Sequence, residues 1–221
     1  MVINIAIDGP AGAGKSTIAK TVSKELGFIY VDTGALYRTV GLNALRQGKD
    51  TKSAEQVVPT LEGVEISLRF VEGEQRVFLG EEDVSSAIRQ NEVSMAASNV
   101  SAIPAVREFL FDLQRDIAKK NNCIMDGRDI GTVVLPDANI KIYLTASAEA
   151  RAERRFKELT EKGQEVFYEK ILEEIKARDY QDMNRPIAPL KQADDAILVD
   201  TTELNLEEAI EYMLKTIKEH L

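Results

Sequence analysis

A glycine-rich segment near the start of the chain, residues 9–16, constrains the fold more than any other feature of the sequence. It reads GPAGAGKS and follows an apolar, β-branched run at residues 2–8. A run that is apolar at nearly every position is typical of a strand buried on both faces of a parallel sheet. Residues 15–26 then have a helical pattern, which we expect Gly27 to end as a C-cap. The order strand, loop, helix predicts an α/β fold.

The glycine-rich segment matches G-x-x-x-x-G-K-[ST], the phosphate-binding loop of nucleoside triphosphatases. Its glycines let the backbone wrap around phosphate oxygens, and the helix that begins near Lys15 adds the positive end of its dipole. We expect Lys15 to contact the β- and γ-phosphates and Ser16 to hold Mg²⁺. The predicted triphosphate-binding residues are Gly9, Pro10, Ala11, Gly12, Ala13, Gly14, Lys15, Ser16 and Thr17.

The strand and helix patterns recur along the chain. Further strands are predicted at residues 28–32, 123–126, 140–144 and 196–200. Helices are predicted near residues 104–120, 147–160, 165–184 and 205–219. Together with the first strand, this repetition predicts a three-layer phosphate-loop fold with a five-stranded parallel sheet.

Residues 62–84 interrupt this alternation. Polar and apolar residues alternate over 64–68 and over 75–79, and Glu72-Gly73-Glu74 is predicted to form the turn between them. This pattern predicts a half-exposed antiparallel hairpin, inserted in the α/β chain as a small lobe.

The balance of charges limits the classes of partner. The 221 residues include 28 Lys and Arg against 37 Asp and Glu, a formal net charge of −9, which argues against a general affinity for nucleic acid. Cys123 has no second cysteine to pair with, and His220 is the only histidine that could join it at a metal. No stretch reaches the about 20 apolar residues that cross a bilayer. We therefore expect a cytoplasmic protein that binds neither membranes nor nucleic acid.

Arginines gather where the predicted strands end. Arg38 follows the strand at 28–32 and Arg128 follows the strand at 123–126, and ligands of open α/β sheets bind at these carboxyl ends. The spacing of Arg178, Asp182 and Arg185 places all three on one face of a helix. Arg38, Arg128 and Arg185 are suited to clamping a second phosphate.

Another helix, at 147–160, carries Arg151, Arg154 and Arg155. Two interpretations of Arg151 stay open, because it is suited to a solvated ion pair with a nearby glutamate as well as to binding a ligand.

Four segments together resemble the bacterial cytidylate kinases, which belong to the nucleoside monophosphate kinase group of phosphate-loop proteins. They are GPAGAGKST at 9–17, DTGALYR at 32–38, DGRDIGTVV at 126–134 and ARDYQDMNR at 177–185. The resemblance spans nearly the whole chain, and the DGRDIGT segment is more specific than the phosphate loop. It implies a core at 1–58, 103–146 and 166–221, a nucleotide-binding insert at 59–102 and a helical lid at 147–165.

The resemblance also implies an activity, which is transfer of the γ-phosphoryl group of ATP to CMP or dCMP by a monomer that uses Mg²⁺. The family positions around the acceptor phosphate are here Thr33, Arg38, Arg128 and Arg185. Those that contact cytosine are Ser98, Arg107 and Asp129, and those that contact the ribose are Arg178 and Asp182. The catalytic positions are Lys15, Arg128, Arg154 and Arg155. Thr33 stands where family members often have serine, and it keeps the hydroxyl group.

Two alternatives remain at this stage. One is another small kinase of the same fold with a different acceptor. The other is a nucleotide-binding switch that hydrolyses ATP or GTP slowly, although the chain has no guanine-reading N-K-x-D segment. Plain structural roles also stay open for Ser98 as a helix cap, Arg107 as the partner of a helical carboxylate and Asp129 as a turn residue.

Overall fold

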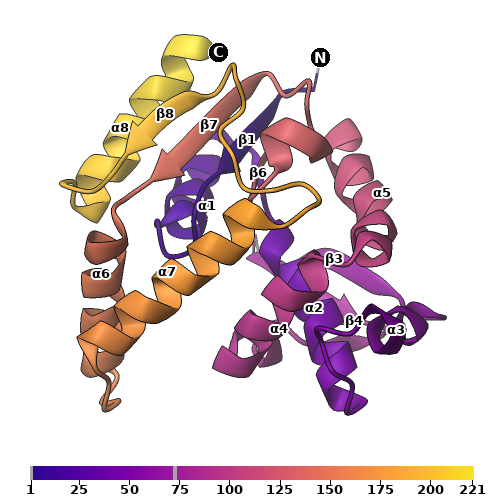
Figure 1. Ribbon diagram of the computed structural model, residues 1–221. Helices are drawn as coiled ribbons and strands as arrows, with labels where there is room; N and C mark the ends of the chain where they lie inside the picture. The colour runs from indigo at the N-terminus through magenta and orange to yellow at the C-terminus, as the bar shows by residue number, and fades with distance from the viewer. Residues whose placement is uncertain (1, 72–73) are drawn as a thin grey trace. The chain divides into compact units, whose positions relative to one another are not determined.

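The computed structural model describes residues 2–71 and 74–221, which form two compact units (Figure 1). The first unit comprises residues 1–30 and 121–221, and the second comprises residues 31–120. Of the predicted hairpin turn, Glu72 and Gly73 lie outside the described residues.

The first unit is built on a five-stranded sheet in the order β2-β6-β1-β7-β8. Its strands are β1 (Asn4–Asp8), β2 (Ile29–Asp32), β6 (Cys123–Gly127), β7 (Ile140–Thr145) and β8 (Ile197–Asp200). β1 pairs in parallel with β6 and β7, and β7 pairs in parallel with β8. The predicted five-stranded parallel sheet is therefore confirmed. β2 starts in this unit and its last two residues belong to the other.

The first unit contains four α-helices in its described residues, and local residues explain where two of them begin or end. They are α1 (Lys15–Leu26), α6 (Ala148–Glu161), α7 (Tyr168–Asn184) and α8 (Leu206–His220). α1 ends at Gly27, whose φ of 69° lies in the left-handed region that glycine adopts without strain. α8 begins with a capping box, in which Asn205 and Glu208 each accept the other's backbone N–H.

The core of the first unit lies between the sheet and two of these helices. Val22 of α1 and Met213 of α8 pack in one cluster with Ile7 and Ile142 of the strands, and all four are fully or almost fully buried. Each side chain of this size stabilises the fold by about 1.5–3 kcal/mol when removed from water. α6 and α7 pack on each other through a smaller cluster that includes Leu159 and Ile171, and Figure 1 shows them side by side.

The second unit is mostly helical and carries a small antiparallel sheet. Its elements are α2 (Thr33–Arg46), α3 (Ala54–Val57), η1 (Val58–Leu61), β3 (Ile66–Val71), β4 (Glu74–Leu79), β5 (Glu82–Asp83), η2 (Ala87–Arg89), α4 (Asn91–Ser101) and α5 (Pro104–Lys120). β3 and β4 pair antiparallel, which confirms the predicted hairpin, and β5 adds a third strand. The division of the chain into core, insert and lid stays a prediction.

One sequence-based placement is wrong. α7 ends at Asn184, and Arg185 has extended backbone angles (φ −63°, ψ 142°). Pro186 causes this, because a proline ring clashes with a helical residue directly before it. Arg185 therefore does not share a helix face with Arg178 and Asp182, and it lies in the segment that follows the helix.

Candidate active site

The glycine-rich segment forms a tight loop between β1 and α1. Gly9 has a φ of 151°, and a Cβ atom there would lie 1.9 Å from the carbonyl oxygen of Leu144, so that only glycine fits. Gly12 and Gly14 also have positive φ angles, 76° and 87°. The Nζ atom of the buried Lys15 donates a hydrogen bond to the carbonyl oxygen of Pro10 at 2.7 Å, which holds the lysine inside the curve of its own loop.

Charged groups of the first unit surround Lys15. Burial and the nearby Arg128 guanidinium lower the pKa of Lys15 well below its ordinary value, while Asp126, Asp8 and Asp182 act in the opposite direction. These side chains lie close enough to the loop to interact electrostatically with Lys15. A phosphate at the loop would add further negative charge beside Lys15 and favour its cationic form.

The side-chain oxygens of Ser16 and Asp126 lie next to each other at the end of the loop. The Ser16 Oγ atom donates to Asp126 Oδ2 at 2.8 Å, and the Tyr30 hydroxyl donates to Asp126 Oδ1 at 3.1 Å. Mg²⁺ in nucleotide sites is typically held by a hydroxyl or one or two carboxylates, together with phosphate oxygens and water. The pair therefore fits this ion. Sequence reasoning assigned only Ser16 to the metal, although Asp126 ends a buried strand and lies in the DGRD motif.

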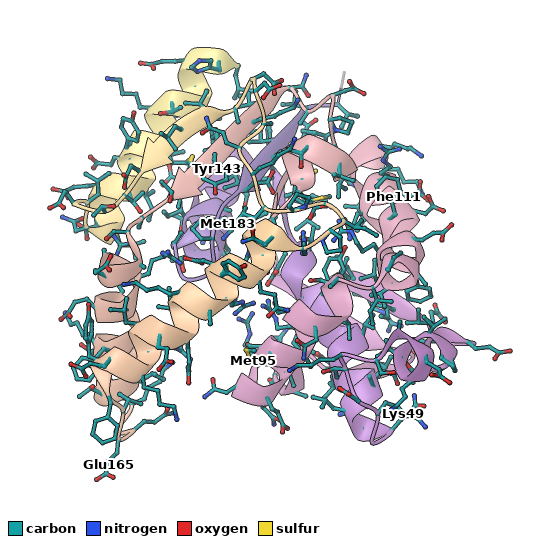
Figure 2. The ribbon with its side chains drawn as sticks, in the orientation of Figure 1. Lys49, Met95, Phe111, Tyr143, Glu165 and Met183 are labelled. Carbon is teal, nitrogen blue, oxygen red and sulfur yellow. The ribbon has the colours of Figure 1, made fainter. Side chains whose placement is uncertain are left out.

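Asp8, the last residue of β1, connects the loop to the DGRD segment. Its carboxylate accepts the N–H groups of Ile130 and Gly131, each at 2.7 Å, at the start of a short π-helix, η3 (Ile130–Val134). Burial raises the pKa of Asp8 to about 6, against the lowering effect of these two hydrogen bonds. Tyr143, labelled in Figure 2, is the residue opposite Asp8 on β7. Asp8 was not singled out from the sequence.

Two arginines of the first unit are paired with carboxylates. Arg128 Nε donates to Asp182 Oδ2 at 2.9 Å, and Arg185 Nη2 donates to Asp129 Oδ1 at 3.1 Å. Burial acts to raise the pKa of Asp182, but the guanidinium groups of Arg128 and Arg178 outweigh it and the pKa is lowered. The structure thus brings together five predicted acceptor residues, from the segment after β6, from α7 and from the segment that follows α7.

The segment after α7 is also fixed by its backbone. Arg185 Nε donates to the carbonyl oxygen of Ala188 at 2.7 Å. Ala188 has a φ of 48°, in the left-handed region that residues other than glycine, asparagine and aspartate rarely adopt. The arginine is therefore anchored at both ends of its guanidinium, by the Ala188 carbonyl and by Asp129.

The other four predicted acceptor residues lie in the second unit. Asp32 caps α2 by accepting the Ala35 N–H at 3.0 Å, and its second oxygen accepts Arg38 Nη2 at 2.8 Å. Thr33 follows Asp32 and is buried. The backbone N–H of Asp32 donates to Gln75 Oε1 at 3.1 Å, so the hairpin supports the start of this segment.

Ser98 and Arg107 lie on consecutive helices, α4 and α5, and both are buried. The Arg107 guanidinium lies 5.7 Å from the centre of the Tyr37 ring, within the range of a cation–π interaction. Its Nη1 atom donates to the Ser101 carbonyl oxygen at 3.4 Å. These contacts fix the arginine in place within its own unit.

The three arginines of α6 have different surroundings. Arg151 is only 3% exposed and forms a two-pronged ion pair with Asp179 of α7, so it is not the solvated surface residue that one interpretation allowed. Arg154 donates to the carbonyl oxygens of Thr201 and Leu204. Arg155 forms an exposed pair with Glu158 at 2.9 Å.

A cavity of about 320 Å³ adjoins the phosphate loop. Ala13, Gly14 and Thr17 line one part of it. Arg154 and Leu204 line another part, and its surface is mostly apolar. A pocket of this size and character next to a triphosphate loop suits a flat heteroaromatic ring.

Comparison with known proteins identifies the family. The family model described as cytidylate kinase matches residues 5–219. This chain belongs to the cytidylate kinase family. A cytidylate kinase from Caldicellulosiruptor saccharolyticus is 54% identical over 213 residues, which cover 96% of this chain and 94% of that protein. Cytidylate kinases from Caldanaerobacter subterraneus subsp. tengcongensis and Streptococcus pyogenes are each 52% identical, over 100% and 96% of this chain and 96% and 94% of their own lengths.

Solved structures agree on the fold. A shikimate kinase from Bacteroides thetaiotaomicron aligns with a TM-score of 0.51 at 14% identity, over 98% of this chain and 97% of that one. An uncharacterised protein from Eubacterium ventriosum aligns with a TM-score of 0.53 at 13% identity, over 98% of each chain. The sequence-based assignment to the cytidylate kinases is confirmed by the family match, and as a member of a kinase family the protein is a phosphotransferase. In the part of the chain that the structure describes, none of the helices is both long and apolar enough to span a membrane.

Proposed function

We propose that this protein transfers the γ-phosphoryl group of ATP to CMP or dCMP, giving ADP and CDP or dCDP. The observation that carries the proposal is the arrangement within the first unit, in a chain of the cytidylate kinase family. There a phosphate loop with a buried Lys15 lies within electrostatic range of Arg128 and Asp182, and these two residues form an ion pair. Mg²⁺ as the metal, action as a monomer and a cytoplasmic location are expectations that accompany the proposal.

The donor is held by the loop. The backbone N–H groups of residues 11–17 and the side chain of Lys15 bind the phosphates of ATP. Ser16 and Asp126 would hold Mg²⁺, which would supply positive charge to neutralise the phosphates of ATP. The adenine ring occupies the apolar cavity beside Arg154.

The acceptor is assigned to the positions that the family uses for it. Thr33, Arg38, Arg128 and Arg185 are assigned to the phosphate of CMP, and Arg178 and Asp182 to its ribose. The edge of the cytosine ring is read by Ser98, Arg107 and Asp129. An arginine together with a carboxylate supplies both donors and acceptors, which match the O2 and N3 acceptors and the exocyclic amine of cytosine.

The transfer of the phosphoryl group needs no covalent bond between the protein and a substrate. The attacking group is a phosphate oxygen that is already anionic, so no general base is needed. Lys15 and the acceptor arginines hold the two nucleotides in line and screen their mutual repulsion. Arg154 and Arg155 on α6 approach the transferring group when the predicted lid closes, which excludes water and limits hydrolysis of ATP.

The test is release of ADP by the full-length protein supplied with Mg-ATP. CMP, dCMP, UMP, AMP, GMP and shikimate are offered separately, because other small kinases share this fold. We expect strong turnover with CMP and dCMP only, and loss of that turnover in Lys15→Met. Slow ADP release that no acceptor stimulates would contradict the kinase assignment, and a preference for AMP, GMP or shikimate would contradict the acceptor assignment.

A further inference from the structure

One buried cation near the phosphate loop has no part in the mechanism above. Arg151 lies in the first half of α6 and is 3% exposed. Its Nη1 atom donates to the carbonyl oxygen of Ala11, a phosphate-loop residue, at 2.9 Å. Its side chain also lies against the loop, since a Cβ atom on Gly12 would be 3.7 Å from the Cβ of Arg151. Arg151 therefore contacts the loop from outside, through backbone and van der Waals contacts.

The guanidinium of Arg151 is held on its other sides. Nη1 and Nη2 donate to the two carboxylate oxygens of Asp179 at 3.0 and 2.5 Å, and Nε donates to the carbonyl oxygen of Ala146 at 2.9 Å. A two-pronged pair of this kind fixes the plane of the guanidinium as well as its position. All three nitrogens of Arg151 are engaged by protein groups. In this arrangement the residue is a support for the loop and not a clamp for phosphate.

We propose that Arg151 is a positioning residue for the phosphate loop and that Asp179 fixes its guanidinium. The proposal rests on the proposed function, because it concerns binding of the phosphoryl donor. A peptide unit is planar and trans, so the direction of the Ala11 carbonyl fixes the direction of the Gly12 N–H. Arg151 thus sets the orientation of one of the backbone donors that bind the triphosphate.

The pair also connects the loop to the helix that bears the ribose-binding residues. Asp179 lies on α7 next to Arg178 and three residues before Asp182. The path Ala11, Arg151, Asp179 consists of direct hydrogen bonds within one unit. The side chain of Arg151 therefore fixes the position of the phosphate loop relative to α7.

An alternative interpretation is that the ion pair between Arg151 and Asp179 only joins α6 to α7. The same two helices offer a matched control, the ion pair between Glu149 and Lys176 at 2.9 Å, with both side chains more than half exposed. This pair also joins α6 to α7, but it lies at the surface, whereas the pair of Arg151 and Asp179 is largely buried. Glu149→Gln breaks it without changing the shape of the side chain.

The experiment measures kcat and the KM values for ATP and CMP in Arg151→Lys, Asp179→Asn and Glu149→Gln, after circular dichroism has shown each to be folded. Lysine keeps the charge of Arg151 but cannot hold Ala11 and Asp179 at once. We expect the KM for ATP to rise about tenfold in Arg151→Lys, as for loss of a charge-assisted hydrogen bond, with the KM for CMP within about twofold of wild type. Asp179→Asn keeps the size of the side chain and is expected to show a smaller rise in the KM for ATP.

Combined and binding measurements complete the test. Because Arg151 and Asp179 act as a unit, the double variant is expected to lose little more than Arg151→Lys alone. An unchanged KM for ATP in folded Arg151→Lys, or an equal rise in Glu149→Gln, would overturn the proposal. Calorimetric measurement of ADP binding distinguishes failure of the proposed function from failure of this proposal. If wild type binds ADP but does not phosphorylate CMP, the proposed function fails. Weaker ADP binding by Arg151→Lys, without a similar loss in Glu149→Gln, would still support the positioning of the loop by Arg151.

Discussion

Replacement of Asp8 by asparagine tests the energetic cost of the carboxylate that supports the DGRD segment. Burial raises the pKa of Asp8 from 3.8 to about 6, so the folded protein keeps a proton on this group at a pH where the unfolded chain has lost it. Folding then takes up a proton, and stability present at low pH is lost as the pH rises through the pKa of the folded state. At 1.36 kcal/mol per pH unit, the difference amounts to about 3 kcal/mol, of which about 2 kcal/mol falls between pH 4 and pH 7.

The assay is urea unfolding of wild type and Asp8→Asn at several pH values between 4 and 7. The free energy of unfolding of wild type minus that of the variant cancels the other titrating groups, because asparagine does not ionise. We expect this difference to fall by about 2 kcal/mol as the pH rises. Loss of one of the two N–H acceptors adds a constant offset that does not depend on pH. A difference that stays constant over the range, or that grows with pH, would refute the assignment of a raised pKa to Asp8.

Two further substitutions test the loop and the acceptor site. Gly9→Ala places a methyl group 1.9 Å from the Leu144 carbonyl oxygen and is expected to cost more than about 3 kcal/mol in urea unfolding, whereas Gly163→Ala, at a φ of 73° with open space around it, should cost only about 1–2 kcal/mol. Equal costs at the two positions would show that the loop can move aside. Asp182→Ala releases Arg128 and should weaken CMP and dCMP alike, with a further loss of about tenfold in kcat/KM for CMP through the 2′-hydroxyl. Equal losses for both acceptors would count against a ribose contact.

The sheet and most helices of the first unit could be predicted from the sequence because their signals are local. β7 was predicted at residues 140–144 and extends over Ile140–Thr145, since its apolar residues alternate with flanking polar ones regardless of the rest of the chain. The end of α1 at Gly27 and the hairpin formed by β3 and β4 likewise depend on neighbouring residues. The phosphate loop needed only its motif and its place between strand and helix.

Features that depend on distant residues could not be predicted in this way. The sequence pattern does not predict α2, because Gly34 and Gly41 lower the helix propensity of this segment, although Asp32 caps the helix. Gly41 is explained only by the packing of α2 on α4, where a Cβ atom would lie 3.0 Å from that of Ala96. The burial of Arg151 likewise depends on Asp179, which lies 28 residues further along the chain.

The pairing of Arg128 with Asp182 and of Arg185 with Asp129 has a consequence for how a nucleotide enters. Each of these two arginines already forms an ion pair with a carboxylate, so an incoming phosphate must compete with that carboxylate. Under the proposed assignment, binding of the acceptor phosphate to these arginines is an exchange of one anionic partner for another. The displaced carboxylate gains free lone pairs at the moment when ribose and base bring their hydroxyl and amine donors. A ligand that carries phosphate alone would free the carboxylates and leave them with nothing to accept, so the two pairs favour a whole nucleotide over inorganic phosphate.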